Sequence, residues 1–148
     1  MTKDVSSTMV SRFSDASLAY GILRLTFGVN IMFRGVMRLY ITTDAFTADL
    51  LKQFSTTPMP TLPVVMLGHT LPYVETIIGL LLILGLATRG ALVVGGLMMT
   101  ALMFGIMVQM NFQIAFLQLS YALIFAILLA FRSYNLLSVD GMRGSTGD

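Results

Sequence analysis

Glu75 is the only charged residue in the apolar stretch 63–86, which makes its carboxylate the clearest candidate for chemistry. Holding a carboxylate in the hydrocarbon of a bilayer costs a few kcal/mol, so the side chain is expected to face the protein interior and to pair with a cation. Arg24 and Arg34, in an earlier apolar segment, are the candidate partners. The trio predicts either a structural ion pair or, because two arginines exceed one glutamate, a site for an anion or a polar headgroup.

Helix geometry places Glu75 at a depth between those of the two arginines. A rise of about 1.5 Å per residue puts Arg24 about 10 Å and Arg34 about 25 Å above the inner start of their helix. Glu75 lies about 18 Å above the inner end of its own helix, so it is predicted to lie between the two arginines. Gly28 and Gly35 fall in the same sector as the arginines and predict a close contact between the two helices.

Other roles stay open for the residues around this trio. Arg34 and Arg38 can also extend to the outer interface without pairing. His69 and Tyr73 precede Glu75 and lie toward the outer end of its span. His69 is a candidate proton relay or quinone contact and Tyr73 a candidate quinone contact, although a lone interfacial histidine is more often a surface residue and a tyrosine is a common interface anchor.

The elements that position these residues are membrane-spanning helices. Each span needs about 20 mostly apolar residues. The uncharged stretch 90–131 would be roughly 60 Å long as one helix, twice the hydrocarbon thickness, so it must cross twice. The predicted fold is an all-α membrane protein, an antiparallel bundle of four transmembrane helices forming one domain over residues 1–148. The predicted spans are about 17–40, 63–87, 90–109 and 113–132, with tails 1–16 and 133–148.

The first outer loop, 41–62, carries Phe46, Leu50 and Phe54 at helical spacing among charged residues. This pattern predicts a short amphipathic helix on the outer membrane surface. With both termini inside, most of the lysines and arginines outside the spans fall on the inner side. We therefore expect a multi-pass protein of a bacterial or archaeal cytoplasmic (inner) membrane, with N and C termini inside.

Composition limits the cofactors and partners. The 148 residues are 56% hydrophobic and 11% charged, which is typical of an integral membrane protein surrounded by lipid. The absence of cysteine excludes thiol redox chemistry and Fe–S ligation by the chain itself, and a single histidine excludes bis-histidine haem. No intrinsic metal or haem is expected. The net charge of +2, carried by dispersed residues, gives no indication of a nucleic-acid partner.

Three ordered motifs carry a family resemblance. They are Leu23-Arg24-Leu25-x-x-Gly28 with Phe33-Arg34-Gly35-x-x-Arg38-Leu39, then Pro72-Tyr-Val-Glu75-x-x-x-Gly79 running to Thr88-Arg89, and last Arg132-x-Tyr134-Asn-Leu-Leu-Ser138-Val-Asp140. Together they resemble the DoxX/DoxD-like family of small four-helix membrane proteins. Arg24 and Glu75 match polar positions of the family pattern. The sequence departs where the third span often ends in a histidine or an acidic residue, because it has Val108-Gln109 there.

The resemblance implies a membrane subunit like that of thiosulfate:quinone oxidoreductase, within a respiratory electron-transfer chain. Quinone or a small anion would then bind at the Arg/Glu cluster, and the redox centres would lie on partner subunits of the complex. The alternative is a non-catalytic structural subunit that docks on a larger membrane energy-transducing complex. The sequence leaves open whether the chain turns over a substrate.

Overall fold

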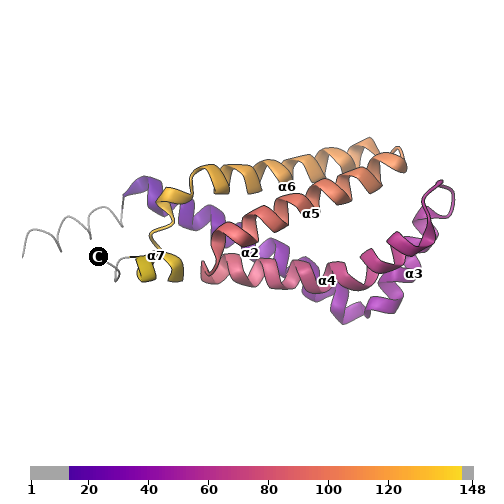
Figure 1. The fold of residues 1–148 in the computed structure, drawn as a ribbon, viewed down its shortest axis with the longest axis horizontal. Helices are drawn as coiled ribbons and strands as arrows, with labels where there is room; N and C mark the ends of the chain where they lie inside the picture. The colour runs from indigo at the N-terminus through magenta and orange to yellow at the C-terminus, as the bar shows by residue number, and fades with distance from the viewer. Residues whose placement is uncertain (1–13, 145–148) are drawn as a thin grey trace, which may run out of the picture.

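The computed structural model describes residues 14–144, and the regular elements in this part of the chain are all helical (Figure 1). Residues 1–13 and 145–148 of the predicted tails lie outside the described residues. The elements are α2 (Asp15–Ile41), α3 (Thr43–Phe54), α4 (Thr61–Leu84), α5 (Thr88–Val108), α6 (Phe112–Ala130), the 3-10 helix η1 (Arg132–Tyr134) and α7 (Val139–Gly144).

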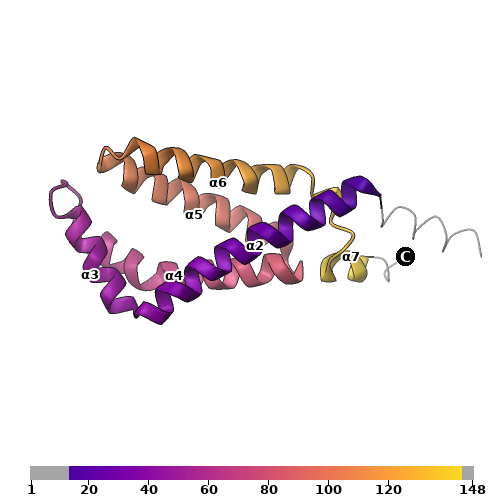
Figure 2. The ribbon, with the colours of Figure 1, turned by 180° about the vertical axis from the view of Figure 1, so that it is seen from behind.

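Helices α2, α4, α5 and α6 are long and apolar enough to cross a membrane. The predicted four-helix membrane fold is therefore confirmed. The predicted amphipathic segment is also helical, as α3. It begins directly after α2, because Thr42 adopts a φ of 79° and its hydroxyl accepts a bond from the Ala45 N–H at 3.4 Å. Most of the predicted loop is thus a helix that turns back against α4 (Figures 1 and 2).

The bundle consists of two helix pairs. Helix α2 packs along α4, and α5 packs along α6, as both ribbon views show (Figures 1 and 2). The shared core contains fully buried Ile31, Leu82, Met99 and Leu128, one from each long helix. The contact between α2 and α6 is much smaller than that between α2 and α4.

Glycines bring α2 and α4 together. A Cβ on Gly35 would lie 2.6 Å from the Thr76 nitrogen and 2.7 Å from the Pro72 carbonyl oxygen. A Cβ on Gly79 would clash with the backbone of Met32. Small residues at such positions let helix backbones approach closely enough for direct contact in lipid. This close contact sets which residues of the two helices face each other.

We expect Gly79→Ala to destabilise the bundle by about 1–3 kcal/mol, because its methyl group must displace the backbone of α2. Unfolding in mixed detergent micelles, followed by circular dichroism, measures the change. Gly90→Ala is the matched control, since nothing lies within 4 Å of a Cβ at Gly90. Equal stability of the two variants would contradict the tight α2–α4 contact.

The segment after α6 folds onto the turn between α4 and α5. The carboxylate of Asp140 accepts the backbone N–H of Ala87 at 3.0 Å and of Thr88 at 2.7 Å, which caps the start of α5. The Asn135 side chain donates to the Thr88 hydroxyl at 3.0 Å. Part of the predicted 133–148 tail is therefore an ordered cap on the bundle.

Candidate functional site

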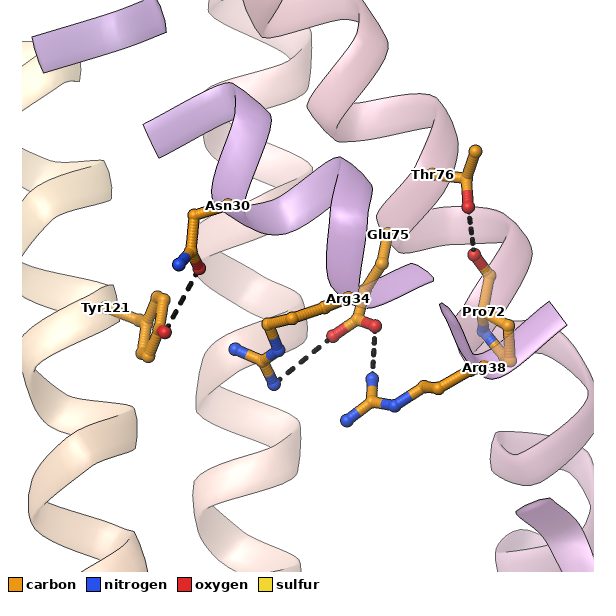
Figure 3. A network of polar contacts seen from close by, with 7 residues as sticks. All are labelled: Asn30, Arg34, Arg38, Pro72, Glu75, Thr76 and Tyr121. Carbon is orange, nitrogen blue, oxygen red and sulfur yellow. Dashed lines mark hydrogen bonds and ion pairs between the residues drawn. The ribbon is translucent and has the colours of Figure 1, made fainter. Parts of the chain in front are cut away.

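Glu75 lies on α4 against α2 and is completely buried. Its two carboxylate oxygens face two arginines of α2, with Arg34 at 3.4 Å from Oε1 and Arg38 in direct contact with Oε2 (Figure 3). The arginines are one helical turn apart, so both reach the same carboxylate. The cluster of Arg34, Arg38 and Glu75 carries a formal charge of +1, because two cations surround one anion.

Arg24 does not join this cluster, although it was one of the two candidate partners of Glu75. Its guanidinium donates to the Leu82 carbonyl at 2.5 Å, the Ile83 carbonyl at 3.3 Å and the Leu137 carbonyl at 2.9 Å. The first two belong to the last turn of α4, whose carbonyls have no partner within the helix. Arg24 therefore binds backbone at the end of α4 and joins it to the C-terminal segment.

The depth prediction failed because the N-terminal end of α2 and the C-terminal end of α4, from which the depths were counted, are not level. Helix α4 ends where Gly85 adopts a φ of 65°, with the Leu86 N–H bonded to the Leu81 carbonyl at 3.0 Å. This end faces Arg24, so the first turns of α2 extend beyond α4 (Figure 1). Glu75 consequently lies level with Arg34 rather than between Arg24 and Arg34.

Aromatic rings hold both arginines of the cluster. The Arg34 guanidinium lies 4.9 Å from the ring centre of Tyr121 on α6, and that of Arg38 lies 4.7 Å from the ring centre of Phe46 on α3. Such cation–π contacts strengthen where water is excluded. The Tyr121 hydroxyl also donates to the Asn30 side-chain oxygen at 3.1 Å (Figure 3). Four helices thus contribute to one polar network.

Buried polar atoms without a hydrogen-bond partner occur toward both ends of the bundle. Glu75 Oε1 accepts no hydrogen bond but pairs with Arg34 at 3.4 Å. The other such atoms among the described residues are Gln118 Oε1, Gln109 Nε2, Tyr20 Oη, Arg24 Nε and Asn135 Oδ1. Gln118 lies one turn before Tyr121 on α6, which places it near the level of Arg34. Buried orphan groups in a native protein often indicate a bound water, ion or ligand that satisfies them.

His69 and Tyr73, the other predicted quinone contacts, lie away from the cluster. The His69 imidazole is half exposed and lies 3.9 Å from the Asp44 carboxylate of α3. Tyr73 is 54% exposed, and two residues along a helix turn it about 200° away from Glu75. Among the described residues, no three histidine, aspartate or glutamate side chains gather where a metal could be held.

The cluster is well suited to hold an acceptor-rich polar group. Each guanidinium carries five N–H donors, and the contacts with Glu75 use only part of this capacity. The side chains of Arg34 and Arg38 are 25% and 24% exposed, so remaining donors are accessible beside the buried carboxylate. Positive charge fixed in an apolar bundle attracts oxygen atoms that carry or develop negative charge.

From the sequence, Arg38 was given no role in the cluster. Arg38 follows Arg34 by four residues, and this spacing puts both on one helix face. That signal could have identified the second partner. Tyr121 had no comparable signal, because its position depends on how α6 packs across α2.

A comparison with known protein families identifies the family of this chain. The sequence model of the DoxX family matches residues 19–110, which run from the first turns of α2 through α5 and include the whole cluster on α2 and α4. Neither the curated proteins nor the solved structures gave a match. The family match covers well over half of the chain. The chain therefore belongs to the DoxX family.

Proposed function

We propose that this chain is the membrane-embedded subunit of a quinone-linked oxidoreductase complex. Arg34, Arg38 and Glu75 bind the quinone headgroup or a small anion, and the redox centres lie on partner chains. Reduction of a quinone builds negative charge on its ring oxygens, which a net positive, preorganised cluster stabilises. The electrons come from the partner's centre, since the chain has no cysteine and only one histidine.

The observation that carries this proposal is the excess of arginine over glutamate at a buried position. A purely structural pair needs one cation for Glu75, yet two arginines contact it. Within residues 14–144, no second carboxylate forms an ion pair with Arg34 or Arg38, and the charge of the second arginine is costly in lipid unless a polar group offsets it. The buried Gln118 side-chain oxygen has no hydrogen-bond partner among the described residues and lies one turn before Tyr121 on α6, so it adds a polar group near Arg34.

We expect Arg34→Gln to weaken quinone binding by about tenfold to a hundredfold, the value of one charge-assisted hydrogen bond. The bundle should persist, because Arg38 still pairs with Glu75. Titration of the protein in lipid nanodiscs with a soluble short-chain quinone measures the affinity. Arg89→Gln removes an exposed arginine outside the cluster and serves as control. Equal affinity of both variants would rule out the cluster as the quinone site.

A structural subunit is the second candidate function, and the surface of α6 favours it. Only Ala115, Phe125 and Leu128 of its 19 residues are buried, while Phe116 is 70% exposed. This apolar surface is covered by lipid or by the helix of a partner subunit. Purification in mild detergent separates the two functions. A docking subunit co-purifies with a large partner, and its variants lose activity only when assembly fails.

A further inference from the structure

A groove runs along the seam between α2 and α6. Its first part is a cavity of about 280 Å³, and its second part is a cavity of about 310 Å³. Leu23 lines both, so they are neighbours along one seam. The first is lined by Leu23, Thr26 and Asn30 of α2 and by Leu117, Ser120 and Tyr121 of α6. The second continues past Ala16 and Tyr20 to Phe131 and Tyr134.

The groove is largely apolar and opens outward from the bundle. Leu23 and Thr26 on its rim are exposed, and in a bilayer this opening faces lipid chains. From Ala16 to Asn30 the seam follows about 21 Å of α2, at the usual rise of a helix. These dimensions suit one hydrocarbon chain lying parallel to the helices.

One end of the groove adjoins the cluster of Arg34, Arg38 and Glu75. Tyr121 lines the groove, and its ring also lies against the Arg34 guanidinium. Asn30, which accepts the Tyr121 hydroxyl, lies one turn before Arg34 on α2 (Figure 3). The polar end of the seam is therefore continuous with the cluster, and the apolar end leads away from it.

We propose that the α2–α6 seam holds the hydrocarbon tail of the quinone, and that the ligand enters the cluster sideways from the bilayer. This inference rests on the proposed function, because it takes the headgroup to bind beside Arg34. Moving the tail from lipid into a protein groove contributes little free energy by itself, since both surroundings are apolar. The tail contributes to affinity through its packing in the groove and through the orientation that it gives to the headgroup.

The test compares two ligands that share one ring, decylubiquinone and the same quinone with a methyl group in place of the tail. Affinities in nanodiscs are expressed per quinone dissolved in the bilayer, which removes the effect of partitioning. Thr26→Phe places a ring in the groove, and Thr70→Phe makes the same change at an exposed site of α4. Ser120→Phe blocks the groove from α6 if the Thr26 variant does not assemble.

We expect Thr26→Phe to lower the affinity for decylubiquinone by about tenfold and to leave that for the tail-less quinone unchanged. Thr70→Phe should change neither. An unchanged decylubiquinone affinity in both groove variants overturns the inference, and so does an equal loss for the two ligands. A phospholipid that co-purifies with the wild type but not with Thr26→Phe, without any tail effect, assigns the seam to lipid instead.

These outcomes are distinct from failure of the proposed function. If the proposed function is wrong, the tail-less quinone either does not bind or binds with the same affinity to the wild type and to Arg34→Gln. In that case the tail assignment fails with it. If the tail-less quinone binds and depends on Arg34, the ring site stands whatever the groove variants show.

Discussion

Replacement of Glu75 by Gln is expected to destabilise the folded protein by about 3 kcal/mol. The change removes the carboxylate that pairs with Arg34 and Arg38 and leaves two cations inside an apolar bundle. Removing one partner of a buried ion pair typically costs about 3–5 kcal/mol. The lower value applies here because both arginines are about a quarter exposed and can extend toward the interface. Unfolding by denaturant in mixed micelles, followed by circular dichroism, measures the loss.

A charge-free variant provides the control for this prediction. Changing Glu75, Arg34 and Arg38 together to Met removes the cations with the anion, and much of the stability should return. Full stability of Glu75→Gln alone would show that the arginines do not depend on this carboxylate. The comparison therefore separates loss of charge balance from loss of side-chain packing.

Replacement of Arg24 by Met is expected to cost about 2–4 kcal/mol and to loosen the C-terminal segment. The change leaves the carbonyls of Leu82, Ile83 and Leu137 without the donor that now joins them. Each buried group that loses its partner costs about 1–3 kcal/mol. Hydrogen exchange read by mass spectrometry should show faster exchange across residues 135–142 than in the wild type.

The Arg24 variant also separates structure from binding. Arg24 bonds the backbone two turns away from Glu75, so a variant that stays folded should bind the tail-less quinone with near wild-type affinity. Arg89→Gln again serves as the matched control, since that arginine is exposed. Unchanged exchange in residues 135–142 of Arg24→Met would contradict the role of Arg24 at the end of α4.

Hydropathy and helical period were enough to predict the four spans and α3, because lipid leaves few alternatives to apolar helices. They could not predict which arginine meets Glu75. That pairing depends on the relative shift of α2 and α4, which the contacts of Gly35 and Gly79 set. Helix ends are the least certain part of a sequence-based prediction, and depths counted from them carry the same error.

The role of Arg24 illustrates a second limit. A buried arginine in a span was expected to pair with a carboxylate, but the carbonyls in the last turn of α4 lack the N–H of a continuing helix and are also acceptors. Gly85 is a recognisable helix terminator, so the end of α4 was partly predictable from the sequence. The capping of α5 by Asp140 was not, because it joins segments 53 residues apart.

The central claim is that the cluster of Arg34, Arg38 and Glu75 binds a quinone headgroup. Its most direct test is photolabelling in nanodiscs with a quinone that carries an azide on the ring, followed by peptide mapping. We expect labels within residues 30–38 of α2 and 117–121 of α6, and their loss when unlabelled quinone competes. Labels confined to the exposed face of α5, or unaffected by competition, would contradict a headgroup site at this cluster.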